Sequence, residues 1–117
     1  LYMTVGDSGM DVTDKSGNRI VAAKTPEAPH KAAVVLRCDL EGNKLELLAD
    51  GMRNPYEPTV DSSGNVFVSD NDDDGNEQTR VNFVVDGGHY GYYPRPRGDR
   101  RLDEVHWSSD QPGVVPT

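Results

Sequence analysis

The chain has 117 residues, a formal net charge of -8 and only 34% hydrophobic residues. This length suits one domain with a small core, and the acidity argues against nucleic acid as a partner because phosphates would be repelled. No stretch approaches the roughly 20 apolar residues of a membrane helix, so no membrane span is expected in this segment.

Turn signals divide the chain into short strand-like runs. The pattern Asp-x-x-Gly-Asn occurs at residues 14–18, 39–43 and 61–65, each time before a run with strand alternation. The glycine supplies the positive φ that a hairpin turn requires, and the aspartate caps the turn with its side chain. We therefore expect hairpins centred on Gly17, Gly42 and Gly64.

The predicted fold class is all-β with antiparallel hairpins. The expected strands lie near residues 1–6, 18–23, 33–39, 44–49, 57–61, 65–69, 80–86 and 90–93. Two hairpins make a four-stranded blade of roughly 40 to 50 residues, so residues 1–93 predict two to three blades of a partial β-propeller. Residues 94–117 contain four prolines and are expected to form a loop that leads to the next blade. The whole chain is thus expected to be a fragment of a single propeller domain.

Cys38 is the only cysteine, which excludes an internal disulfide and a C-x-x-C site in this chain. Its surroundings, A-V-V-L-R-C-D-L, predict a buried and unreactive strand residue. Residues 95–101 hold four arginines, and this segment is either a basic loop on the rim of an acidic protein or a site for an anion or acidic partner.

An acidic cluster separates two of the predicted strands. Five carboxylates occupy eight positions: Asp70, Asp72, Asp73, Asp74 and Glu77. Like charges this close repel one another unless water or a cation screens them. The run Asp70-x-Asp72-x-Asp74-Gly75 matches the first half of a calcium loop, but Val81 stands where the bidentate Glu is required, which excludes an EF-hand. Two alternatives stay open: a calcium site with ligands Asp70, Asp72, Asp73 and Asp74, or a solvated acidic turn.

Five motifs form an ordered series that spans nearly the whole chain. They are L-Y-M-T-V-G-D-S-G at 1–9, A-V-V-L-R-C-D-L-E-G-N at 33–43, G-M-R-N-P at 51–55, N-V-F-V-S-D-N at 65–71 and V-N-F-V-V-D-G-G-H-Y-G-Y at 81–92. This series resembles the glucose/sorbosone dehydrogenase family, the soluble quinoprotein propellers that bind pyrroloquinoline quinone (PQQ) with calcium. It is more similar still to the dehydrogenase-like propeller domain of large planctomycete-type secreted proteins.

The resemblance implies a calcium-associated dehydrogenase. A six-bladed propeller would oxidise a sugar or alcohol with PQQ and pass electrons to a cytochrome c, as a partner or as a haem c module elsewhere in the full protein. The location implied is periplasmic or secreted. The chain starts in a strand-like run without an initiator methionine or signal peptide, so we expect an internal fragment that is inactive by itself.

The resemblance also implies roles for individual residues. Asp7 matches an aspartate that orients a catalytic histidine, which would lie upstream of Leu1; without the resemblance Asp7 would be an ordinary turn cap. Arg53 and Asn54 match the family's R-N-P segment, whose arginine and asparagine contact the anionic quinone, and a guanidinium fork suits carboxylates. Tyr56 stands where the family usually has Gln in the cofactor site. The competing role for Arg53 is a structural arginine that ties a turn to carbonyl groups.

Calcium ligation in the family uses carbonyl groups of a Gly-Pro pair, and these positions are Asp72 and Asp73 here. The acids would hold the ion through side-chain oxygens, or they mark a separate structural calcium site. The enzyme hypothesis predicts that one end of the propeller brings together Asp7, Arg53, Asn54 and the 70–74 loop.

Two of the three histidines are assigned smaller roles. His89 is expected to be a turn residue that begins an inner strand, His106 beside Trp107 is a packing residue or a pocket edge, and His30 is given no role.

The alternative function, from a different class, is a non-catalytic propeller that binds carbohydrate or protein and uses calcium to rigidify a loop.

Overall fold

The structure, a computed structural model, describes residues 1–25, 27–71, 79–92 and 114–115. These residues form eleven strands and no helix, which confirms the all-β prediction. The strands are β1 (Tyr2–Val5), β2 (Met10–Thr13), β3 (Arg19–Ala23), β4 (His30–Lys31), β5 (Ala33–Arg37), β6 (Glu46–Met52), β7 (Tyr56–Val60), β8 (Val66–Asp70), β9 (Arg80–Val84), β10 (Gly88–His89) and β11 (Val114–Val115). In this part of the chain no helix exists that would be long and apolar enough to cross a membrane.

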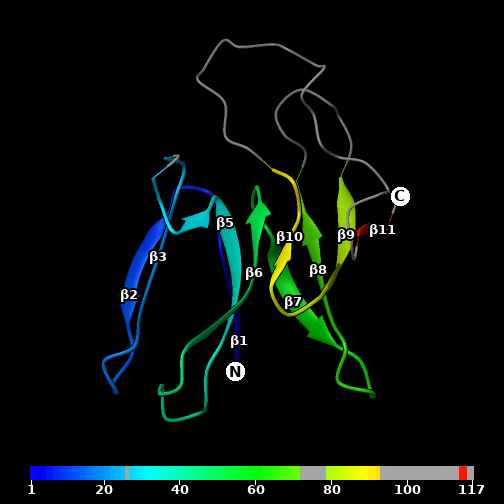
Figure 1. The fold of residues 1–117 in the computed structure, drawn as a ribbon. Coiled ribbons are helices and arrows are strands. Elements are labelled where there is room, and N and C mark those ends of the chain that lie inside the picture. Colours follow the sequence, from blue (N-terminus) through cyan, green and yellow to red (C-terminus); the bar gives the residue numbers. More distant parts are fainter. Residues whose placement is uncertain (26, 72–78, 93–113, 116–117) are drawn as a thin grey trace.

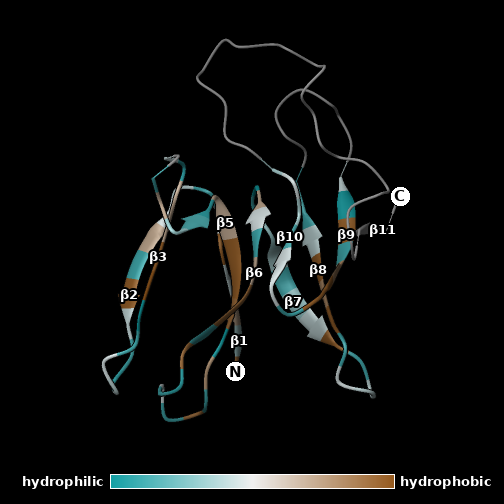
Figure 2. Cartoon of the chain, viewed as in Figure 1, coloured by the Kyte–Doolittle hydropathy of each residue, from teal (hydrophilic) through white to brown (hydrophobic). Residues whose placement is uncertain are grey.

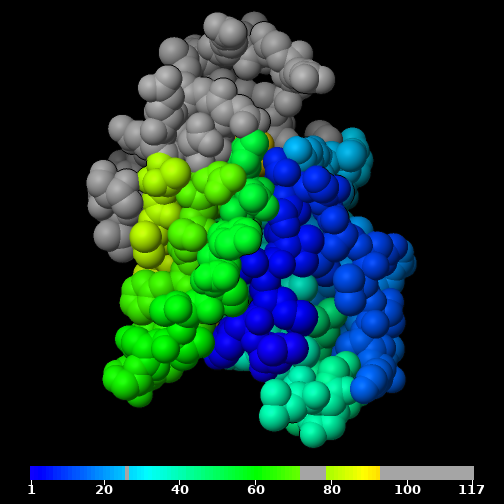
Figure 3. All heavy atoms as spheres, turned by 180° about the vertical axis from the view of Figure 1, so that it is seen from behind, coloured from blue at the N-terminus to red at the C-terminus, as the bar shows by residue number. Residues whose placement is uncertain are grey.

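The strands form three small sheets (Figure 1). Sheet A has the order β1-β5-β6-β10, sheet B has β2-β3-β4, and sheet C has β11-β9-β8-β7. Neighbouring strands are antiparallel except for two short parallel pairs, β10 with β6 and β4 with β3. Viewed from behind, β1 lies beside β7, so an edge of sheet A borders an edge of sheet C (Figure 3).

The three Asp-x-x-Gly-Asn turns join neighbouring strands as predicted. They connect β2 to β3, β5 to β6 and β7 to β8, and all three lie at one end of the molecule (Figure 1). In the first turn, Asp14 Oδ1 accepts hydrogen bonds from the backbone N–H groups of Ser16 at 2.9 Å and Asn18 at 2.8 Å. Gly17 has φ of 96°, a conformation that costs a residue with a Cβ about 1 kcal/mol or more.

The first two turns also bind each other. The N–H of Leu45 donates to Asp14 Oδ2 at 2.9 Å, and Asn18 Nδ2 donates to the carbonyl of Leu45 at the same distance. The bond from Leu45 is the largest of the influences that lower the pKa of Asp14 to about 2, because it stabilises the ionised carboxylate. Asp14 therefore connects sheet B to sheet A in addition to capping its own turn.

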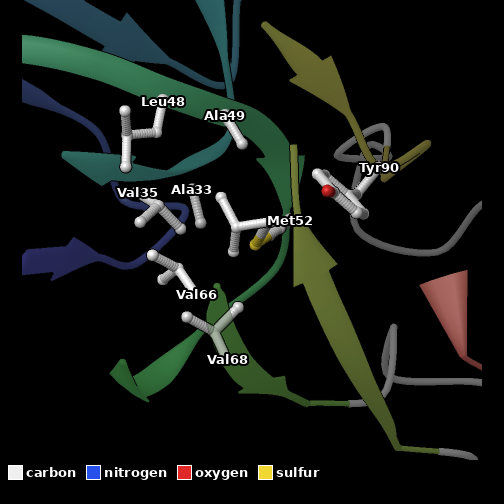
Figure 4. Close-up of a cluster of buried hydrophobic side chains, with 9 residues drawn as sticks. Ala33, Val35, Leu48, Ala49, Met52, Val66, Val68 and Tyr90 are labelled. Atoms are coloured by element: carbon white, nitrogen blue, oxygen red, sulfur yellow. The ribbon is translucent and has the colours of Figure 1, made fainter. Parts of the chain in front are cut away.

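Sheet A is the middle layer of the core because β5 is buried on both faces. Val34 and Leu36 point into a cluster with Ile20 and Ala22 of sheet B. The alternate β5 residues, Ala33 and Val35, join Leu48, Ala49 and Met52 of β6 in a second cluster with Val66, Val68 and Val84 of sheet C and with Tyr90 (Figure 4). A strand covered on both sides needs a continuous apolar run, and hydrophobic colouring follows β3 and β5 in Figure 2.

Cys38 belongs to the cluster between sheets A and B and is buried, as predicted, but it lies one residue beyond the end of β5 instead of in the strand. The strand prediction was incomplete elsewhere. β2 falls in a stretch where no strand was expected, and β10 lies at 88–89 instead of 90–93. β2 was not predicted although Met10-Asp11-Val12-Thr13 alternates apolar and polar residues, because four residues are the shortest run in which alternation indicates a strand, and none of the four is fully buried. Residues 114–115 form β11, within the segment expected to be a loop.

Candidate functional site

Sheet A carries several polar residues at the end opposite the hairpin turns. β1 and β6 are both antiparallel to β5, and β10 is parallel to β6, so these three strands run in the same direction. Residues that follow their carboxyl ends must therefore lie at one edge of the molecule (Figure 1). Asp7 follows β1, Arg53 follows β6 and Tyr92 follows β10.

Asp7 is the point where four separate segments meet. Its N–H donates to the carbonyl of Arg53 at 2.8 Å. Its carboxylate Oδ2 accepts a hydrogen bond from the hydroxyl of Tyr92 at 3.1 Å and forms an ion pair with Lys24 Nζ at 2.7 Å. The Asp7 side chain is only 15% exposed, whereas that of Lys24 is 47% exposed. Lys24 and Tyr92 were not predicted from the sequence.

Arg53 and Asn54 are held through their main chains. Their N–H groups donate to the carboxylate of Asp70, at 3.2 Å for Arg53 and 2.8 Å for Asn54. The side chain of Asn54 packs on Gly6, because a Cβ at Gly6 would lie 2.6 Å from Asn54 Oδ1. Asp7, Arg53, Asn54 and Asp70 are thus brought together at one end, and their catalytic or cofactor roles stay predictions.

Asp70 is deeply buried beside an arginine. It is 2% exposed, and its Oδ2 also accepts a hydrogen bond from Arg80 Nη2 at 3.3 Å. Burial raises the pKa of Asp70, and the bonds from Asn54, Arg80 and Arg53 act in the opposite direction. In the described residues this carboxylate ties the β6–β7 loop to β8 and β9.

The metal prediction rests on residues that are only partly described. Asp72, Asp73 and Asp74 lie outside the described residues, as do His106 and Trp107. In the described part, no three or more His, Cys, Asp or Glu residues are arranged to hold a metal ion. The calcium site therefore stays a prediction. Tyr56, the remaining predicted cofactor residue, lies on β7 and is 64% exposed.

A second polar cluster surrounds Asp50, which sequence reasoning did not single out. Asp50 Oδ1 lies 2.6 Å from His89 Nδ1, and Asp50 Oδ2 accepts a hydrogen bond from the N–H of Lys31 at 2.8 Å. His30 Nδ1 is 4.0 Å from the same oxygen. Burial acts to raise the pKa of Asp50, but the bonds from His89 and Lys31 outweigh it and the pKa lies below its ordinary value. Asp50 therefore connects β4, β6 and β10.

The ring of His89 lies directly over Gly51. A Cβ at Gly51 would lie 2.4 Å from the nearest ring atom, and Gly51 has φ of 73°, so both space and backbone conformation require glycine. Further backbone bonds attach the same segment to β6: Tyr90 N–H donates to Asp50 at 3.0 Å and Tyr92 N–H donates to Gly51 at 2.8 Å. This attachment places the Tyr92 hydroxyl at Asp7.

Neither a family model, nor a curated protein, nor a solved structure matches this sequence.

Proposed function

We propose that this chain is part of a β-propeller dehydrogenase of the quinoprotein type, which oxidises a sugar or alcohol and passes the electrons to a cytochrome c. The observation that supports this proposal is the 2.8 Å hydrogen bond between Asp7 and Arg53, with Asn54 packed on Gly6. These residues come from turns far apart in sequence. Strand direction alone brings these turns to the same end of the molecule, and the hydrogen bond and the packing then place Asp7 and Gly6 in direct contact with Arg53 and Asn54 there.

The polar groups at this end fit an anionic quinone. The main chain of Arg53 is occupied at its N–H by Asp70 and at its carbonyl by Asp7, so contact with a ligand falls to the guanidinium. A guanidinium binds carboxylates bidentately, which suits the carboxylates of an anionic quinone. Bound PQQ would supply the acceptor for two electrons. Arg53 and Asn54 would hold it, and Asp7 would fix a proton on the nitrogen of a histidine base.

The arrangement of the sheets supports a propeller as the larger architecture. Sheets B, A and C pack in series, with one apolar cluster between B and A and another between A and C. The outer face of sheet C carries Phe67 and Phe83, whose ring centroids are 5.3 Å apart, and Val81, which is 40% exposed. A further sheet packed on this face would continue the series.

A specific observation also favours the non-catalytic alternative, a calcium-stabilised propeller that binds carbohydrate or protein. The carboxylates of Asp7 and Asp70 already have partners within the chain: Lys24 and Tyr92 for the first, Arg80 and backbone N–H groups for the second. Such contacts are sufficient to explain the two aspartates as structural residues.

The two functions are separated by a cofactor experiment. The intact enzyme that contains this chain is purified and loaded with PQQ and calcium, and reduction of an artificial dye is measured with a panel of sugars and alcohols. Arg53→Ala is expected to abolish the activity and leave the fold intact. The matched control is Arg19→Ala, which removes an exposed ion pair with Asp11 at the hairpin-turn end. Full activity in Arg53→Ala would remove the main support for a dehydrogenase.

Calcium is tested in the same preparation by calorimetry. The wild type is expected to bind calcium with a gain in thermal stability, and Asp72→Ala is expected to bind it more weakly. If the two proteins give the same heat and the same melting temperature with and without calcium, the acidic cluster is a solvated turn. Calcium binding without PQQ-dependent activity would favour the scaffold.

A further inference from the structure

Lys24 and Tyr92 contact the same oxygen of Asp7. Lys24 Nζ lies 2.7 Å and the Tyr92 hydroxyl 3.1 Å from Oδ2. Over the described stretches of the chain, both polar contacts of this carboxylate fall on Oδ2. Two donors on one oxygen restrict rotation of the carboxylate, and a charge-assisted bond from an ammonium is stronger than a neutral one. Oδ1 is left as the atom that accepts a further donor.

Backbone hydrogen bonds attach the segments that carry both donors to the rest of the fold. Lys24 directly follows β3, where Ala23 accepts a hydrogen bond from Ala32 at 3.0 Å. Tyr92 is 8% exposed, and its N–H bond to Gly51 holds its backbone against β6. The Asp50–His89 pair attaches the preceding residues to the same strand. These bonds fix the backbone positions from which Lys24 and Tyr92 reach Asp7.

We propose that Lys24 and Tyr92 are positioning residues that hold Asp7 Oδ2, so that Oδ1 accepts the N–H of the imidazole that acts as base. The inference rests on the proposed function for its effect on catalysis. The geometry itself, two donors fixed on one oxygen, does not depend on that function. A carboxylate that is held in this way selects the tautomer of the imidazole it contacts and therefore the nitrogen that receives the substrate proton.

The kinetic experiment uses four variants of the PQQ-loaded protein. Lys24→Met and Tyr92→Phe are each expected to lower kcat about 10-fold with little change in KM, because they remove an interaction used in the chemical step and not in binding. Lys24→Arg keeps the charge and is expected to restore most of kcat. Lys15→Met is the matched control, since Lys15 binds the carbonyl of Glu41 at the hairpin-turn end. Unchanged kcat in both Lys24→Met and Tyr92→Phe would overturn the proposal.

A second measurement does not need quinone activity. In carbon-13 labelled protein, the carboxyl resonance of Asp7 is expected to move in Lys24→Met and in Tyr92→Phe and to stay in place in Lys15→Met. No movement in either variant would refute the contacts on Oδ2. If the resonance moves but the wild type shows no quinone-dependent activity, the positioning geometry stands and the proposed dehydrogenase function fails. The two failures are thereby distinguished.

Discussion

Asp70→Ala is expected to be among the most damaging single substitutions at this end of the molecule. It removes one partner of an ion pair in which the side chains of Arg80 and Asp70 are 4% and 0% exposed. It also removes the acceptor for the backbone N–H groups of Arg53 and Asn54. Loss of one partner of a buried pair costs about 3–5 kcal/mol. Since domains have total stabilities of about 5–15 kcal/mol, this loss would be a large fraction of the whole.

The measurement is urea unfolding followed by circular dichroism, with the free energy of unfolding extrapolated to zero denaturant. Asp61→Ala is the matched control. Asp61 Oδ1 likewise accepts two backbone N–H groups, from Ser63 at 2.8 Å and Asn65 at 2.9 Å, but in an exposed hairpin turn. The control is expected to lose much less stability, because water replaces the missing acceptor. Equal losses in the two variants would refute the argument that burial of Asp70 and Arg80 sets the cost.

Three further predictions concern the core and the turns. Asn82 is 0% exposed, and neither polar atom of its side-chain amide has a hydrogen-bond partner among the described residues. Asn82→Leu is therefore expected to raise the free energy of unfolding by about 1 kcal/mol. A lower free energy of unfolding would show that the amide has a partner in the native protein. Asp14→Asn is expected to lower the melting temperature at neutral pH. Folding lowers the pKa of Asp14 from 3.8 to about 2, so the difference in melting temperature between wild type and Asp14→Asn should be complete above pH 3.8 and vanish as the pH falls toward 2. A difference in melting temperature that does not change with pH would contradict the bond from Leu45. Cys38 should react with a thiol probe only after denaturation, and rapid labelling of the native protein would count against its place in the core.

Local sequence signals predicted the hairpins well. Each Asp-x-x-Gly-Asn turn is built from bonds between residues two to four positions apart, such as those from Ser63 and Asn65 to Asp61, so the pattern contains nearly everything the turn needs. The buried strand β5 was equally predictable, because a strand with apolar side chains on both faces appears in the sequence as a continuous apolar run. These features need no knowledge of the distant chain.

The candidate site was only partly predictable because its contacts are long-range. The resemblance pointed to Asp7 and Arg53, but no local pattern connects Asp7 to Tyr92, which is 85 positions away. The Asp50–His89 pair spans 39 positions and depends on parallel pairing between β10 and β6. The one usable signal was the Asp50-Gly51 dipeptide, because a glycine at the end of a strand indicates a close approach by another segment.

The contacts of Asp7 distinguish it from the aspartates of the hairpin turns. Asp14, Asp39 and Asp61 each use a carboxylate oxygen to cap their own turn through N–H groups two and four residues later. The described carboxylate contacts of Asp7 contain no such local bond; they come from Lys24 and Tyr92. Closing two long loops onto one oxygen costs conformational entropy that a turn cap does not require. Long-range contacts also hold the carboxylates of Asp50 and Asp70, so the donor proposed at Oδ1 is what would separate a positioning role of Asp7 from a structural one.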